Sequence, residues 1–277
     1  MSKKYEFTGE TKVLFGVTLR QIRALIDFRF ATKGELGGWI EDEKNLSQDG
    51  NAWVSGNAWV YGNARVSGNA QVSDNAQVYG NARVSGNAQV YGNAQVYGNA
   101  WVYGNAWVSG DAQVSGDAQV SGNAWVYGNA WVYGNAWVYG NAWVSGNAQV
   151  YGNARVSGNA RVSGNARVSD NAWVYGNAWV YGDAWVYGDA QVYGNADFML
   201  VGPLGSRRAF LTIHADAKIG IRFTTGCFSG SEQAFSEAVQ KTHGDSEFGK
   251  QYRAAIAFSK LVVKAKTPEE GESREQR

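Results

Sequence analysis

The chain has 277 residues, 44% of them hydrophobic, and a formal net charge of +1. Basic and acidic residues are balanced in each segment, with 8 against 8 in residues 1–49, 5 against 6 in 50–196 and 12 against 10 in 197–277. This balance excludes the strong positive field that nucleic acid or an anionic membrane attracts, so we expect neither as a partner. The 36 glycines and 2 prolines fit neither collagen nor a disordered chain.

The cysteine content and the hydropathy pattern exclude further classes of protein. The single cysteine, Cys227, rules out an internal disulfide and a cysteine-based zinc site. The N-terminus has no apolar stretch of signal-peptide length, and no run of about 18 apolar residues occurs. We therefore expect a cytoplasmic protein without membrane segments and without a metal site.

The first segment, residues 1–49, has no repeat. KYEFTG (4–9) and KVLFGVTLRQIRALIDF (12–28) predict a short hairpin, because both are rich in β-branched and aromatic residues. GELGGWIEDEKNLSQ (34–48) then leads into the repeats.

A six-residue unit, A-x-V-[YS]-G-N, fills residues 50–196 without a slip in register. Valine recurs 24 times from Val54 to Val192, and the variable x position holds only Trp, Gln or Arg. Asp replaces Gly at Asp74 and Asp170. Asp replaces Asn at four positions, Asp111, Asp117, Asp183 and Asp189. Gly, Asn and Asp adopt left-handed backbone angles most cheaply, so each G-N pair is predicted to form a corner.

Three architectures can be weighed against this period. A helix would lose up to about 1 kcal/mol at each Gly and Asn and would scatter Ala and Val around its axis. An antiparallel meander would mix small and bulky residues on both faces. A coil of short parallel strands directs Ala and Val inward and x outward. With three hexads per turn, the sequence predicts about eight coils with an interior too narrow for a ligand.

This pattern resembles the hexapeptide-repeat family, whose fold is the left-handed parallel β-helix. LRQIRALIDF (19–28) and GELGGWIEDEKNLSQDGNAWV (34–54) resemble the start of uncharacterised hexapeptide-repeat proteins of enterobacteria and of phages or prophages. Some of those proteins carry a putative acetyltransferase label. The resemblance implies an all-β fold and a phage or prophage origin.

Every third hexad belongs to one face of the predicted coil, so the x residues form three outward ladders with side chains about 4.8 Å apart. Eleven of the 12 tryptophans occupy the x position, and 13 of the 15 tyrosines follow the valine. The first face holds the longest tryptophan run, Trp107, Trp125 and Trp143, and it continues with Arg161 and Trp179. These five residues, with Trp131 on the second face and Trp137 and Trp173 on the third, are the candidate binding residues.

Three interpretations of the ladders stay open. Stacked side chains stabilise neighbouring coils of any repeat protein, so the ladders could be structural only. Contiguous exposed aromatic residues also mark contact sites, and the hexapeptide-repeat family commonly forms trimers, which favours a homo-oligomer. A third interpretation is that a planar or carbohydrate ligand, such as a nucleotide or a sugar, stacks on the rings.

The sequence argues against an enzyme, and we predict no catalytic residue and no cofactor. Acyltransferases of this family use a histidine on the coils as a general base, but residues 1–213 contain no histidine. The repeats also lack Cys, Lys and Glu. The alternative function is an acyltransferase that uses acetyl-CoA, which the label of the resembling proteins implies.

Beyond Asp197 the composition changes to that of a small β-β-β-α-α domain, predicted over residues 197–265. FMLVGPL, AFLTIHA and KIGIRFTTGCF predict three strands, and SGSE at 229–232 resembles a capping box that opens the helix EQAFSEAVQKTH, which ends at Gly244. EFGKQYRAAIAFSKLVVKA predicts a second helix, and residues 266–277 a flexible tail. A site built from Cys227, His214, His243 and Asp245 is a weaker alternative to structural roles for these residues.

The two flanking segments are predicted to cap the coils. A parallel β-helix has open ends with unpaired backbone groups, and covering them prevents end-to-end polymerisation. We expect residues 1–49 to form the N-terminal cap, with Trp39 as a plug over the first coil. The whole chain is predicted to be a rigid scaffold or binding protein.

Overall fold

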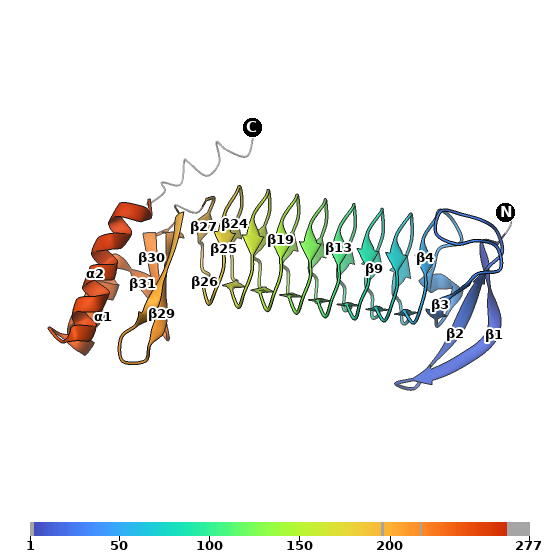
Figure 1. Ribbon diagram of the computed structural model, residues 1–277, viewed down its shortest axis with the longest axis horizontal. Helices are drawn as coiled ribbons and strands as arrows, with labels where there is room; N and C mark the ends of the chain where they lie inside the picture. Colours follow the sequence, from blue (N-terminus) through green and yellow to red (C-terminus); the bar gives the residue numbers. More distant parts are fainter. Residues whose placement is uncertain (1–2, 195–196, 217, 265–277) are drawn as a thin grey trace. The chain divides into compact units, whose positions relative to one another are not determined.

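The computed structural model describes residues 3–194, 197–216 and 218–264 (Figure 1). It is a parallel β-solenoid with an antiparallel sheet and two helices in its C-terminal part, as predicted. The predicted tail at 266–277 lies outside the described residues. The chain divides after Asn147 into two compact units.

The first unit begins with an antiparallel hairpin and continues into short strands. Its first elements are β1 (Tyr5–Leu14), β2 (Val17–Ala24), β3 (Leu36–Ile40) and the 3-10 helix η1 (Glu43–Asn45). Sixteen two-residue strands follow: β4 (Trp53–Val54), β5 (Trp59–Val60), β6 (Arg65–Val66), β7 (Gln71–Val72), β8 (Gln77–Val78), β9 (Arg83–Val84), β10 (Gln89–Val90), β11 (Gln95–Val96), β12 (Trp101–Val102), β13 (Trp107–Val108), β14 (Gln113–Val114), β15 (Gln119–Val120), β16 (Trp125–Val126), β17 (Trp131–Val132), β18 (Trp137–Val138) and β19 (Trp143–Val144).

These strands form the three faces that the eighteen-residue register predicts. Face 1 is β4-β7-β10-β13-β16-β19, face 2 is β3-β5-β8-β11-β14-β17, and face 3 is β6-β9-β12-β15-β18. All pairs among the two-residue strands are parallel, and each x residue lies beside the x residue of the next coil, as Trp107 lies beside Trp125. The prediction of which side chains share a face is confirmed within this unit.

The interior of the solenoid consists of alanine and valine. From Ala52 to Val144 the Ala and Val positions of every hexad are buried, with at most 1% of each residue exposed. Burying one valine side chain stabilises a fold by about 1.5–3 kcal/mol, so the repeated valines supply most of the apolar driving force. Because no side chain larger than valine enters this layer, the bulky x residues are all placed outside it.

The corners depend on the left-handed backbone of the Gly position. Gly104 has φ +71°, and a Cβ there would lie 3.0 Å from the nitrogen and 3.1 Å from the oxygen of Gly122, one coil further on. Asp74 adopts φ +60° in the same position, and its carboxylate accepts a hydrogen bond of 3.0 Å from the Gly92 N–H. Asp is therefore tolerated at this corner because its side chain bonds the backbone of the next coil.

Asparagine side chains form columns along the corners. In the column Asn51, Asn69, Asn87, Asn105, Asn123 and Asn141, each Nδ2 donates to the Oδ1 of the next residue at 2.8–3.0 Å. The donors all point the same way along the chain. In the other two columns, Asp111 accepts a hydrogen bond from Asn93, and Asp117 accepts one from Asn99. An ionised carboxylate accepts hydrogen bonds but does not donate them, so Asp can take the accepting position.

The N-terminal segment covers the open end of the first coil by supplying donors to its carbonyls. Lys4 Nζ donates to the Ala52 oxygen at 2.8 Å, and Asn45 Nδ2 donates to the oxygens of Gly62 and Ala64 at 3.1 and 2.9 Å. Lys4 is 2% exposed, and burial lowers its pKa to about 8. The predicted hairpin is present, although its turn lies at Phe15–Gly16, inside the second segment predicted as a strand.

The predicted plug role of Trp39 is wrong. Trp39 lies in β3, which pairs in parallel with β5, so that Trp39 is the register partner of Trp59 on the outside of face 2. The Lys12 ammonium lies over both rings, 4.1 Å from the Trp39 centroid and 4.7 Å from that of Trp59. The sequence GGWI imitates the hexad A-x-V, with Gly38 in the Ala position and Ile40 in the Val position.

The second unit repeats the same solenoid geometry. Its two-residue strands are β20 (Gln149–Val150), β21 (Arg155–Val156), β22 (Arg161–Val162), β23 (Arg167–Val168), β24 (Trp173–Val174), β25 (Trp179–Val180), β26 (Trp185–Val186) and β27 (Gln191–Val192). Within the unit they pair in parallel as β22-β25, β20-β23-β26 and β21-β24-β27.

An antiparallel sheet and two helices complete the second unit. The sheet is β28 (Phe198–Leu204), β29 (Ala209–Asp216), β30 (Gly220–Thr225) and β31 (Phe228–Ser231), and the helices are α1 (Glu232–His243) and α2 (Glu247–Val262). The predicted count of three strands is wrong, because the turn Gly226–Cys227 divides the third predicted segment. The N-cap of α1 is Ser231, not Ser229, and α1 ends at Gly244 as predicted. Among the described residues, no helix is long and apolar enough to cross a membrane.

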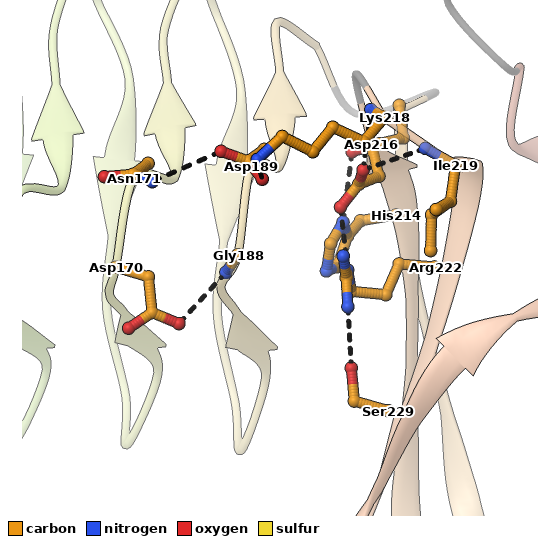
Figure 2. A network of polar contacts seen from close by, with 11 residues as sticks. Asp170, Asn171, Gly188, Asp189, His214, Asp216, Lys218, Ile219, Arg222 and Ser229 are labelled. Carbon is orange, nitrogen blue, oxygen red and sulfur yellow. Dashed lines mark hydrogen bonds and ion pairs between the residues drawn. The ribbon is translucent and has the colours of Figure 1, made fainter.

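The C-terminal segment supplies acceptors to N–H groups of the last coil, and Figure 2 shows the polar contacts of Lys218 and its neighbours beside the corner residue Asp189. Thr212 Oγ1 accepts from the Trp185 N–H at 3.1 Å, and the Asp197 carboxylate accepts from the N–H groups of Tyr193 and Gly194. Lys218 forms an ion pair with the corner residue Asp189, and hydrogen bonding to Lys218 lowers the Asp189 pKa. Each coil donates its backbone N–H groups to carbonyl oxygens of the next coil, as the Trp53 N–H donates to the Ala70 oxygen. The first coil therefore needs donors for its carbonyl oxygens, and the last coil needs acceptors for its N–H groups.

Candidate functional site

The tryptophan run of face 1 is a stack whose ring faces cover one another. The ring centroids of Trp107 and Trp125 are 4.7 Å apart with planes 7° apart, and those of Trp125 and Trp143 are 5.4 Å and 11° apart. All three side chains are partly buried. Both faces of the Trp125 ring are therefore occupied, and a ligand from solvent meets mainly the ring edge.

The first residue of the same face is covered by protein. Trp53 is only 2% exposed, because Tyr5 and Phe28 contact it edge-on at centroid distances of 6.5 and 5.3 Å. The expectation that every x residue faces solvent is wrong at this position. The N-terminal segment uses Trp53 as an anchor.

Face 2 carries a tyrosine stack beside its x residues. The rings of Tyr61, Tyr79 and Tyr97 are nearly parallel, with centroids 5.1 and 5.0 Å apart. Burial, together with the two neighbouring phenols, raises the pKa of Tyr79 to about 12. This stack binds adjacent coils to each other and does not present a reactive phenolate at neutral pH.

The most exposed tryptophans lie outside the stacked run. Exposed fractions are 43% for Trp101, 44% for Trp131 and Trp137, and 47% for Trp179 in the second unit. Trp131, Trp137 and Trp179 are among the predicted binding residues, and Trp101 is not. The ladder neighbours of Trp101 are Arg83 and Gln119, so no tryptophan stacks on its ring, and this pattern is visible in the sequence.

Trp101 and Trp137 lie on face 3 with one coil between them. β12 and β18 both pair with β15, so Gln119 is the x residue between the two tryptophans. The Arg83 guanidinium lies over the Trp101 ring at 4.9 Å, on the side away from Gln119. Tyr103 Oη donates to Gln119 Oε1 at 3.2 Å, which holds this side chain beside the tyrosine. The strands that carry the two tryptophans are thus about 9.6 Å apart along the face.

The remaining predicted binding residues lie in the second unit. Arg161 and Trp179 are register partners. Trp173 Nε1 donates to Ser157 Oγ at 3.0 Å, and Trp179 Nε1 donates to Ser163 Oγ at 3.1 Å. These bonds link successive coils, so the indole groups here have a structural role in addition to any contact they make.

The C-terminal domain holds a cavity of about 450 Å³. Cys227, His243, Arg207, Phe235 and Tyr252 are among its lining residues, and the His243 ring stacks on Tyr252 at 5.5 Å. His214 does not line it.

The weaker four-residue site of the sequence is not assembled. His214 is fully buried in β29, where its Nδ1 lies 3.0 Å from the Ala215 oxygen and burial lowers its pKa to about 4. Asp245 pairs with Arg253. Within residues 3–194, 197–216 and 218–264, no group of three or more His, Cys, Asp or Glu side chains could hold a metal ion.

The repeats are similar to those of a known family, and part of the chain is similar to a curated protein. A family model described as "YdcK Beta solenoid repeat" matches residues 58–74, 76–92, 88–102, 94–110, 112–128, 118–134, 130–146, 148–162, 160–176 and 172–188. A curated protein, "Uncharacterized acetyltransferase YdcK" of Escherichia coli (strain K12), is 44% identical over 50 residues. That alignment spans 18% of this chain and 14% of the relative.

Proposed function

We propose that this chain, a hexapeptide-repeat β-helix protein, is a non-enzymatic scaffold that self-associates through the tryptophans of face 3. The observation that carries the proposal is the pair of exposed rings, Trp101 and Trp137, held two coils apart with Gln119 between them. A phage or prophage origin and a cytoplasmic location are further parts of this proposal.

The spacing of the two rings suits an inserted aromatic ring. Stacked neighbours in face 1 lie 4.7 and 5.4 Å apart, and the gap of about 9.6 Å on face 3 equals two such steps. A ring that enters over Gln119 would therefore stack on both tryptophans. Such aromatic contacts stabilise by about 0.5–1.5 kcal/mol each beyond the area they bury.

A second copy of the chain is the occupant that the charges and the side chains favour. The formal net charge is +1, so two copies repel each other weakly. From Trp101 to Trp137 the x residues of face 3 are uncharged, and another copy brings exposed tryptophans of its own. A face of this kind, aromatic and poor in charge, has the composition of an interface centre. A trimer is the expected assembly.

Replacing both tryptophans by glutamine, which occupies the x position of many other hexads, tests this proposal. Trp101→Gln/Trp137→Gln should reduce the native mass, measured by analytical ultracentrifugation, to that of the single 30.0 kDa chain. Trp131→Gln is the matched control, because Trp131 is equally exposed but lies on face 2, and it should keep the parental mass. A parent that sediments as a single chain at all concentrations, or a double variant with the parental mass, refutes self-association.

The printed name of the Escherichia coli relative favours a second candidate, an acyltransferase that uses acetyl-CoA. Incubation of the purified chain with acetyl-CoA and an amine or hydroxyl acceptor separates the two functions, whereas binding heat alone does not, because acetyl-CoA itself carries phosphate groups. The scaffold proposal expects no acetyl transfer. Saturable binding together with acetyl transfer to an amine or hydroxyl acceptor would establish the enzyme instead. Titration with a planar ligand or an oligosaccharide would reveal ligand capture by the same rings, which the scaffold proposal does not expect.

A further inference from the structure

Two arginines lie side by side at the N-terminal end of face 3. Arg65 in β6 and Arg83 in β9 are direct register partners, and both side chains are exposed. Like charges directly opposite each other in a sheet are destabilising. At most other x positions the chain uses Gln or Trp, so this pair is unfavourable for folding alone.

The acidic residues nearby are engaged elsewhere. The ion pairs found among the described residues include neither Arg65 nor Arg83. In the adjoining segment, Glu41 Oε2 accepts from the Gly62 N–H at 2.6 Å, Asp42 caps η1, and Glu43 pairs with Lys3 at 2.8 Å. The positive charge of the two guanidinium groups is therefore not balanced by a bonded carboxylate in the part of the chain that is described.

The arginine pair separates two hollows in the surface. One, of about 280 Å³, is lined by Arg65, Ser67, Arg83, Ser85 and Trp101. The other, of about 310 Å³, is lined by Lys44, Asn63, Arg65, Asn81 and Arg83.

The linings suit an anion. Ser67 and Ser85 follow the valines of the coils that carry the two arginines, whereas Tyr103 follows the valine of the next coil on this face. The smaller serine side chains leave the first hollow open. The first lining contains cations and hydroxyls, the second contains cations and amides, and neither contains a carboxylate.

We propose that Arg65 and Arg83 together bind the phosphate group of a small phosphorylated ligand. Adjacent strands place the two side chains about 4.8 Å apart at their base, so both guanidinium groups can donate to oxygens of one tetrahedral anion. The serine hydroxyls and the Lys44 ammonium supply further donors at the rims. A bound dianion also removes the repulsion between the arginines. The inference rests on the proposed function only in that both use face 3 as an open surface.

The variant Arg65→Gln/Arg83→Gln tests this inference. If the arginines bind phosphate, the variant loses stabilisation by phosphate, which a merely structural role would not produce. In sodium chloride alone, the double variant should unfold within a few degrees of the parental temperature, because removal of the like-charge contact offsets the lost contact between Arg83 and Trp101. Added sodium phosphate at matched ionic strength should raise the unfolding temperature of the parent only. By isothermal titration, the dissociation constant for phosphate should increase about tenfold or more in the variant.

Arg167→Gln is the matched control. Arg167 lies over Trp185 at 5.1 Å, as Arg83 lies over Trp101, but its register partners within the second unit include no arginine. This control should bind phosphate like the parent. The same titrations with inorganic phosphate and with glucose 6-phosphate distinguish free phosphate from a phosphate ester, and binding of either one that is lost in the double variant supports the site.

Two results overturn the inference. One is a parent that binds neither probe, and the other is phosphate binding that Arg167→Gln weakens as much as the double variant does. The sedimentation mass of the single variant Arg65→Gln, which leaves Arg83 over Trp101, keeps this outcome separate from the proposed function. If self-association through the tryptophans is correct, Arg65→Gln keeps the parental mass whether or not phosphate binds.

Discussion

Substitutions of Gly104 test how the corners determine the fold. An alanine there must adopt φ near +71°, which costs an L-residue about 1–2 kcal/mol, and its Cβ would crowd the backbone of Gly122 at 3.0–3.1 Å. The lower entropy of the unfolded chain offsets about 0.4–1 kcal/mol of this cost. With the contribution from crowding, we expect Gly104→Ala to lower the free energy of unfolding by about 2 kcal/mol.

Gly104→Asp should be less harmful than Gly104→Ala although Asp is larger. Asp74 shows how its carboxylate can accept the N–H of the glycine one coil further on, at 3.0 Å. Hydrogen bonds to charged groups stabilise by about 1.5–3 kcal/mol, and Asp tolerates left-handed angles better than Ala. We therefore expect the Asp variant to be more stable than the Ala variant by at least about 1 kcal/mol.

Urea unfolding followed by tryptophan fluorescence measures these differences, provided that the dependence on urea concentration is the same for all variants. Gly194→Ala is the control, since a Cβ there meets no atom within 4 Å and the backbone is not left-handed. It should change the stability by no more than about 0.5 kcal/mol. An Ala variant at position 104 that equals or exceeds the Asp variant in stability would contradict this account of the corners.

Three further predictions concern the ends and the ladders. Because burial lowers the Lys4 pKa to about 8, Lys4 binds fewer protons in the folded state than in the unfolded state between pH 8 and 10, and the free energy of unfolding should rise with pH there. Lys4→Met should reduce this rise in pH-dependent urea titrations and leave the smaller contribution of Lys12, whose pKa burial also lowers. Thr212→Val removes the acceptor of the Trp185 N–H and should cost about 1–3 kcal/mol in thermal unfolding, whereas Thr212→Ser should retain most of the stability. Trp125→Gln should cost about 1–3 kcal/mol by loss of two stacking partners, and more than Trp101→Gln by the same assay; equal losses would show that stacking does not stabilise the coils.

The repeat could be interpreted from the sequence because its constraints are local. Alternation within each hexad decides that Val108 points inward and Trp107 outward, and the eighteen-residue step decides that Trp125 follows Trp107 on the same face. Both follow from strand geometry alone. The same step identified the three faces without any knowledge of pairing between distant segments.

The six-residue period does not predict which tryptophan side chains are exposed, because their exposure depends on contacts with other side chains. Trp53 is buried because a hairpin from the N-terminal segment covers it, and Trp39 is an outer residue because GGWI imitates a hexad. The tryptophans of the longest run are shielded by their own neighbours, so a longer run offers less accessible ring surface. The arginine pair of face 3 could have been noticed from the sequence, because Arg65 and Arg83 are eighteen residues apart.

The eighteen-residue step also limits how such a chain can change its length. Adding or deleting a whole coil leaves every downstream side chain above the same column. A single inserted hexad after Gly116 would instead place Trp125 beside Gln113, and the contact between Trp107 and Trp125 would be lost although every hexad kept its sequence. A gene that lengthens by recombination between identical hexads therefore produces a new surface pattern in two insertions of every three, with the buried layer unchanged.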